Sequence, residues 1–86
     1  MIRKIKDYIL ENEFKMIILK DRVDITNYSD IDHFDDNKII IRHNNGLVVI
    51  KGYKLIISKL LEDELLIYGK VENIELRWIF LKVEFP

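Results

Sequence analysis

The sequence contains no cysteine, and it has one proline and three glycines among 86 residues. Without cysteine, the chain has no disulfides, no thiol nucleophile and no cysteine-ligated zinc or iron–sulfur site. This absence is compatible with a reducing compartment but does not establish one. The formal net charge is −1, so the chain lacks the strongly positive field that nucleic-acid-binding proteins use.

Long apolar runs are also absent. The runs Leu65–Tyr68 and Trp78–Leu81 are far shorter than the ~20 residues of a membrane-spanning helix. Basic residues stand near the start at Arg3, Lys4 and Lys6, but neither an apolar core region nor a small-residue cleavage site follows them. The sequence therefore predicts no secretory signal.

Hydrophobic residues make up 49% of the chain, which is at the upper end for an ordinary soluble domain. A domain of this length buries only a modest share of its surface. Some apolar side chains should therefore stay exposed unless a partner or a second copy covers them.

The first twelve residues have a helical pattern. Ile2, Ile5 and Ile9 recur at helical spacing, and the basic residues Arg3, Lys4 and Lys6 occupy the rest of the wheel. We expect an amphipathic helix over residues 1–12 that packs on its own domain. The alternative is a helix on an anionic membrane surface, which would make the protein a peripheral membrane protein.

Residues 13–86 read as a single all-β domain. Runs rich in isoleucine, valine and aromatic residues follow one another at roughly eight-residue intervals. The sequence predicts a small sandwich, or a short solenoid-like sheet of bent strands. The expected strands are Phe14–Leu19, Val23–Asn27, Ile31–Phe34, Lys38–His43, Leu47–Lys51, Tyr53–Ser58, Leu65–Tyr68 and Val71–Val83, the last in two pieces.

Glycine and asparagine mark the turns. Asn44, Asn45 and Gly46 separate two β runs, which predicts a hairpin with a type I′ turn, whose positive φ angles Asn-Gly tolerates. Gly52 and Gly69 interrupt β runs, and a glycine within a strand indicates a bulge, a sharp bend or a close backbone approach.

The C-terminal run changes its apolar face. Ile74, Leu76, Trp78 and Phe80 alternate on one face, and a second set from Ile79 onward alternates on the other. Either a bulge resets the register near Trp78, or both faces are covered, for which a second subunit is a plausible source. Large apolar residues dominate protein interfaces. The candidate interface residues are Trp78, Phe80, Leu81 and Phe85.

Residues that could carry chemistry are few. We interpret His33 and His43 as ordinary histidines, because no third metal ligand accompanies them. The aspartates of the acidic stretch lack EF-hand spacing, and a solvated loop is favoured over a cation site. We therefore expect no enzyme, no catalytic or metal-binding residue and no cofactor. The aspartates are Asp30, Asp32, Asp35 and Asp36.

Two other function classes stay open. Tyr53, Tyr68, Trp78 and Phe80 would suit a nucleic-acid-binding β-barrel that stacks bases, although core and interface roles are favoured for these aromatics and we expect no nucleic acid partner. The second alternative is a β protein that binds a small ligand or a metal ion.

An ordered set of short motifs resembles the YabP/YqfC sporulation family. That family shows a Phe-acidic-acidic entry to a strand, then G-x-L-x-I-x-G, then an apolar strand, then an acidic residue before L-x-I-x-G-x-I. The corresponding segments here are Phe34–Ile41, Gly46–Gly52, Leu55–Ile57 and Glu64–Val71. The short length and the Glu-Asp-Glu-Leu-Leu-Ile entry resemble the YqfC branch.

The resemblance implies a non-enzymatic protein of endospore formation. It implies the mother-cell cytoplasm, with the forespore membrane as a peripheral site, and a role in building the spore envelope. The implied partner is the membrane protein commonly encoded beside YqfC-type proteins. Separately, the strands that are apolar on both faces and the exposed β edges predict a homo-oligomer. The family generally has glycine where this chain has Asn27. Asparagine also tolerates left-handed backbone, so we expect a turn there.

Overall fold

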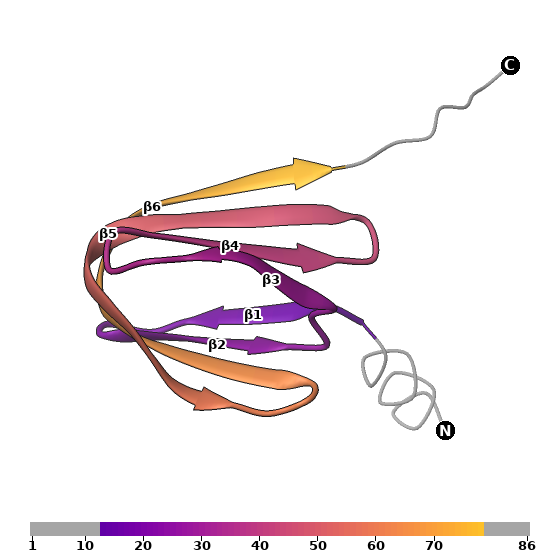
Figure 1. The fold of residues 1–86 in the computed structure, drawn as a ribbon, viewed down its shortest axis with the longest axis horizontal. Coiled ribbons are helices and arrows are strands. Elements are labelled where there is room, and N and C mark those ends of the chain that lie inside the picture. Colours follow the sequence, from indigo (N-terminus) through magenta and orange to yellow (C-terminus); the bar gives the residue numbers. More distant parts are fainter. Residues whose placement is uncertain (1–12, 79–86) are drawn as a thin grey trace, which may run out of the picture.

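Six antiparallel strands form one open sheet in the computed structural model, which describes residues 13–78. The strand order is β1-β2-β6-β5-β4-β3 (Figure 1). The strands are β1 (Lys15–Ile18), β2 (Arg22–Thr26), β3 (Asp30–Phe34), β4 (Lys38–His43), β5 (Gly46–Leu60) and β6 (Glu64–Trp78). The all-β prediction is confirmed. The expected helix over residues 1–12 and the tail at 79–86 lie outside the described residues.

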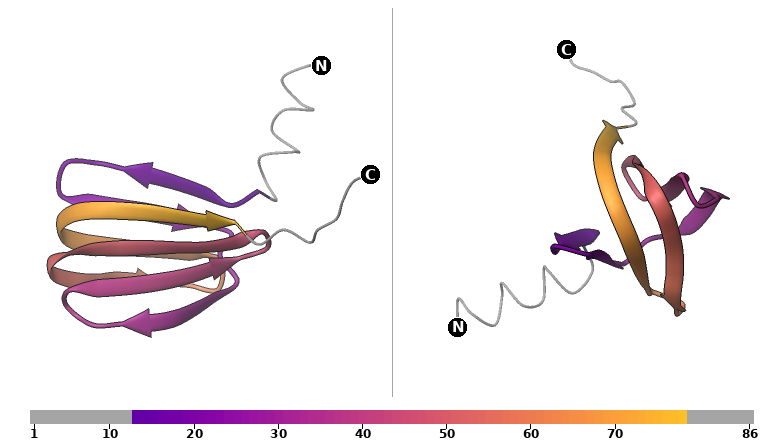
Figure 2. Two further views of the ribbon diagram at one scale, coloured as in Figure 1. Left: turned by 90° about the horizontal axis from the view of Figure 1, so that it is seen from above. Right: turned by 90° about the vertical axis from the view of Figure 1, so that its left-hand side faces the viewer.

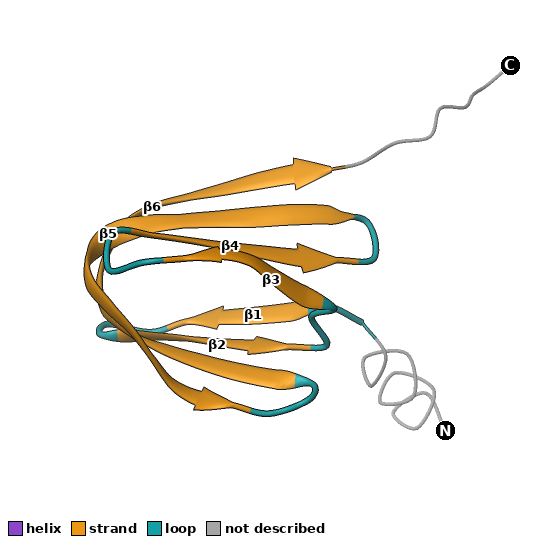
Figure 3. Ribbon diagram, viewed as in Figure 1, coloured by secondary structure: helices purple, strands orange, loops and turns teal. Residues whose placement is uncertain are grey.

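Two predicted pairs of strands are each one long strand. The sequence placed breaks at Gly52 and Gly69, but β5 and β6 run through these glycines for 15 residues each. The chain bends there instead of turning back, and the connecting loops are short (Figure 3). The result is one strongly bent sheet, which differs from two separate sheets and from a solenoid.

The glycines at the bend allow β5 and β6 to approach each other. A Cβ atom on Gly52 would lie 2.0 Å from the carbonyl oxygen of Lys70. This distance is far below van der Waals contact, so only glycine fits at this position. Gly69 has a φ of 133°, a backbone conformation open mainly to glycine. The strand pairing shifts register between Lys51 and Gly52. At both glycines β5 and β6 approach too closely for a side chain, since a Cβ on Gly69 would lie 2.7 Å from the carbonyl oxygen of Lys54.

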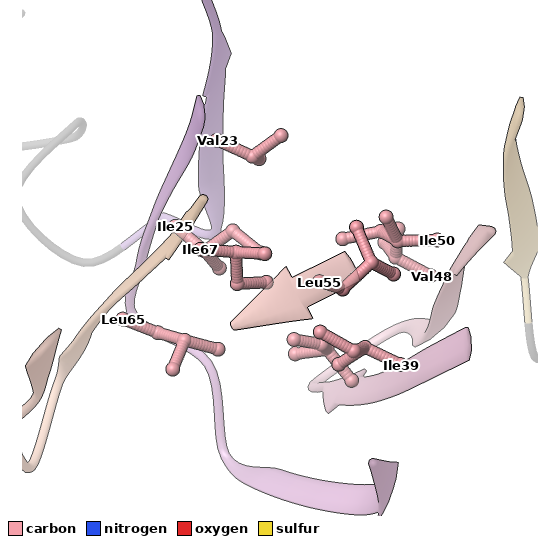
Figure 4. Packing of buried hydrophobic residues seen from close by; sticks show 9 residues of the cluster. Val23, Ile25, Ile39, Val48, Ile50, Leu55, Leu65 and Ile67 are labelled. Carbon is pink, nitrogen blue, oxygen red and sulfur yellow. The ribbon is translucent and has the colours of Figure 1, made fainter. Parts of the chain in front are cut away.

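The bend brings the two halves of the sheet face to face around one core (Figures 1 and 2). One half contributes β2 and the start of β6, and the other contributes β4 and the start of β5. Side chains from both halves meet in a single buried cluster (Figure 4). The cluster contains Val23, Ile25, Ile39, Ile41, Val48, Ile50, Leu55, Leu65 and Ile67.

The β4–β5 hairpin occurs where the sequence predicts it. His43 pairs with Gly46 across the turn, so Asn44 and Asn45 are its two central residues. The predicted type I′ geometry is wrong, because neither asparagine has a positive φ. Gly46 serves packing instead, since a Cβ there would lie 1.9 Å from the carbonyl oxygen of Arg77 on β6.

Asn27 makes the predicted turn after β2, with a φ of 64°. Its side-chain amide donates a hydrogen bond to the carbonyl of Glu13 at 2.8 Å, and its backbone N–H donates to the carbonyl of Asp63 at 2.7 Å. The Tyr28 hydroxyl donates to the carbonyl of Leu61 at 2.6 Å. The turn is thereby tied to the β5–β6 loop before the chain crosses to β3 at the sheet margin.

Candidate interaction surface

The C-terminal half of β6 carries apolar side chains that the core leaves half covered. Ile74 pairs with Ile50, and Leu76 pairs with Val48, so these side chains share one face of the sheet. Val48 and Ile50 are fully buried. Leu76 is 54% exposed and Trp78 is 53% exposed. We call Ile74, Leu76 and Trp78 the apolar strip.

The opposite face of the same strand is charged. The Arg77 guanidinium lies 2.8 Å from the Glu75 carboxylate, and the Lys51 ammonium lies 3.6 Å from it on the other side. The hydrogen bond from Arg77, helped by the charge of Lys51, lowers the pKa of Glu75. This half of β6 is therefore apolar on one face and charged on the other.

Three rings meet where the apolar strip ends. The Phe14 ring stacks on the His43 ring with centroids 4.1 Å apart, and the Trp78 ring meets His43 edge-on at 5.7 Å. His43 is only 6% exposed, and burial lowers its pKa. The Asn45 N–H donates to its Nδ1 at 3.2 Å, which places the proton of the neutral ring on Nε2. We call these three rings the end cluster.

The end cluster lines an open hollow of about 460 Å³. Glu13, Asn44 and Asn45 complete its wall. The end cluster could not be predicted from the sequence, because the three rings come from segments about thirty residues apart in the chain. The position of His43 at the end of a predicted strand was the available signal.

Trp78 is the predicted interface residue that the structure describes. It belongs to both the apolar strip and the end cluster. Phe80, Leu81 and Phe85 lie outside the described residues. The same holds for the predicted membrane-surface residues Ile2, Arg3, Lys4, Ile5, Lys6 and Ile9.

Comparison with known proteins decides the family. The model of the YabP family matches residues 11–77, a range that spans all six strands except the last residue of β6. The chain belongs to the YabP family. No curated protein matches it. Membership in the YabP family suggests a sporulation-related protein. Residues 13–78 contain no helix that could cross a membrane.

The YabP-type motifs coincide with the bend of the sheet. Gly46 and Gly52 bound the first half of β5, and Gly69 lies in β6 opposite the bend. The spacing between Gly46 and Gly52 thus sets the length of the part of β5 that lies before the bend. The half-strand that carries the apolar strip follows directly after the last motif.

The acidic stretch of this YabP-family chain is structural. Asp35 accepts hydrogen bonds from the backbone N–H groups of Asn37 and Lys38, each at 2.8 Å. These bonds and the contact with His33 lower the pKa of Asp35. Asp32 forms an ion pair with Arg42 at 2.6 Å. Within residues 13–78, acidic and histidine side chains form no group of three that could hold a metal ion.

Proposed function

We propose that this protein is a non-enzymatic scaffold of endospore formation, closest to the YqfC branch. It self-assembles, docks on a membrane-associated partner, or does both while the spore envelope is built. Its place is the mother-cell cytoplasm, with peripheral attachment at the forespore membrane. Its further partner is the membrane protein commonly encoded beside YqfC-type proteins.

The observation that carries this proposal is the half-exposed apolar strip. Leu76 and Trp78 lie on the face that buries Val48 and Ile50 completely, so the core-forming surface continues beyond what residues 13–78 cover. Exposed contiguous apolar surface is typical of sites that bind another protein, a membrane or a ligand. Large side chains such as Trp78 supply most of the energy in such contacts.

The first test is the mass of the full chain in solution. We expect light scattering to show a species larger than one chain, or a complex with the soluble part of the membrane partner. Trp78→Ala should weaken that association by about 2 kcal/mol, or roughly thirtyfold in the dissociation constant.

Tyr53→Ala is the matched control, because Tyr53 is an aromatic residue of similar exposure, 54%, on β5. It should leave the mass unchanged. Circular dichroism should show that both variants are folded. The proposal would be contradicted if the wild-type chain stayed a monomer at high concentration and did not bind the soluble part of the membrane partner.

A further inference from the structure

The C-terminal half of β6 has one edge with which no strand of the described residues pairs. On one side this segment pairs with β5. On its other side, β2 pairs with β6 from Glu64 to Tyr68 and no further. Among residues 13–78, no strand continues this pairing beyond Tyr68, and Figure 1 shows this half-strand as the outermost ribbon at the top. Its outward N–H and C=O groups can pair with another strand.

This edge is the most regular of those that the described sheet leaves open. The β3 edge has a register shift between Ile31 and His33. The second half of β5 has two shifts within residues 53–59, and β1 (Lys15–Ile18) is four residues long. Bulges and short strands discourage pairing. Asn73–Trp78 pairs with β5 without a shift, so its edge is straight enough to accept a strand.

The pattern of side chains limits how two such edges can pair. Residues directly opposite each other in an antiparallel pair share a face. If the twofold axis passed between two neighbouring residues, each even-numbered residue would lie opposite an odd-numbered one. The residues of the apolar strip would then face the charged residues of the other copy. The axis must therefore pass through a residue. Centring on Asn73 or Ile74 carries the pairing back into residues 71–73, where β6 shifts register against β5. With the axis at Trp78, the only two described residues that lie opposite each other are Trp78 and its own copy.

The charges select among the remaining centres. An axis at Glu75 sets Glu75 against its own copy, and an axis at Arg77 sets Arg77 against its own copy, which like-charge repulsion disfavours. An axis at Leu76 sets Glu75 opposite Arg77 twice. It also sets Trp78 opposite Ile74 twice, with Leu76 against Leu76. Charge complementarity and apolar matching therefore agree on one register.

We propose that two copies of this chain pair through the C-terminal halves of β6, antiparallel about an axis at Leu76. The inference rests on the proposed function, because it specifies the contact by which the protein self-assembles. The pairing joins two six-stranded sheets into one and brings the two apolar strips side by side. The occupant of the edge is a second copy of the same segment.

Single cysteines test the register, because the chain has no cysteine of its own. Residues directly opposite in a sheet have Cα atoms ~4.5–5.5 Å apart, within reach of a disulfide. Leu76→Cys should form an intermolecular disulfide under mild oxidation of the full chain. Ile74→Cys should not, since in this register Ile74 lies about 14 Å along the sheet from its own copy.

Ile56→Cys is the control for non-specific collision. Ile56 is 58% exposed, similar to Leu76, and lies on the second half of β5. On a non-reducing gel, Leu76→Cys should give roughly tenfold more dimer than either of the other variants, because disulfide formation demands this geometry. Preferred crosslinking of Ile74→Cys would refute the register, and preferred crosslinking of Ile56→Cys would refute the edge.

Charge reversal separates contacts between chains from those within one chain. Glu75→Arg alone and Arg77→Glu alone place like charges across the axis, and each should weaken pairing roughly tenfold. A mixture of the two variants restores both opposite-charge pairs between chains while each chain keeps its internal repulsion. Mixed dimers should therefore form at wild-type strength.

The outcomes distinguish this inference from the function on which it rests. If the wild type assembles but the mixture shows no recovery, the edge or register is wrong and the scaffold proposal stands. If the wild type does not self-associate in light scattering, the inference fails. The scaffold proposal then depends on the membrane partner alone.

Discussion

His43 links the fold to the interaction surface through a single side chain. Its ring is buried between Phe14 and Trp78, and the Asn45 N–H donates to its Nδ1. A charged imidazole at this position would lose hydration, which is why burial lowers its pKa. The neutral ring therefore suits the end cluster better than the protonated ring does.

This pKa shift predicts a loss of stability in mild acid. The unfolded chain binds a proton on His43 near the ordinary pKa, and the folded chain does so only at lower pH. Stability should therefore fall as the pH drops from about 7.5 to about 5.5, a window around the ordinary histidine pKa of about 6.5. In His43→Phe, which cannot titrate, the urea midpoint should fall less over the same window.

His33→Gln is the control for this measurement, because the His33 side chain is 42% exposed and lies outside the end cluster. It should still lose stability as the pH drops through this window, because His43 is intact. Equal acid sensitivity in His43→Phe and the wild type would show that His43 does not cause the effect.

At the scale of elements, β5 and β6 define the molecule because each belongs to both halves of the sheet. The first half of β5 pairs with β4, and the first half of β6 pairs with β2. Gly52 and Gly69 lie where the two strands bend together. The free edge of β6 is a consequence of this bend, since β2 follows only the first half of the strand.

Gly52→Ala should therefore be strongly destabilising. The added Cβ would lie 2.0 Å from the Lys70 carbonyl oxygen, and the backbone of one strand has to move. We expect a loss of about 3 kcal/mol in the free energy of unfolding, the upper range for overpacking. Chemical denaturation would measure it, with Ser58→Ala on the exposed part of β5 as a control. A loss below about 1 kcal/mol would mean that the strands separate easily there.

At the scale of the whole molecule, one core serves both halves of the sheet. Ile25 comes from β2 and Ile41 from β4, and both are fully buried in the same cluster. The two halves have no separate hydrophobic centre among the described residues. The domain should therefore unfold as a unit.

Ile25→Ala and Ile41→Ala test this cooperativity. Each should lower the free energy of unfolding by about 3 kcal/mol, the usual cost of emptying a buried isoleucine site. Each should leave a single transition that fluorescence of Trp78 and circular dichroism report at the same denaturant concentration. Separate transitions for the two probes would show that the halves fold independently.

Local patterns of residues are enough to predict most of the local structure of this chain. Runs rich in isoleucine, valine and aromatic residues located all six strands, because such runs are a feature of short stretches of sequence. The bounds of β4 agree with the prediction, whereas β5 and β6 were each predicted as two strands. Asn27 indicated the turn after β2, and Gly52 and Gly69 indicated the bend of β5 and β6. These positions can be read from the sequence because the backbone dihedral angles of a residue depend mainly on that residue and its chain neighbours. The ordered motifs between Phe34 and Val71 pointed to the YabP family, which the match over residues 11–77 confirms.

The order of the strands in the sheet, and the surface that this order leaves exposed, could be learned only from the three-dimensional fold. The pairing of β2 with β6 joins residues about forty positions apart, and no local pattern encodes it. The end cluster depends on that arrangement, as does the exposure of Leu76 and Trp78. Sequence showed that apolar surface was in excess, and the position of each strand in the sheet decided where that surface lies, because burial depends on non-local neighbours.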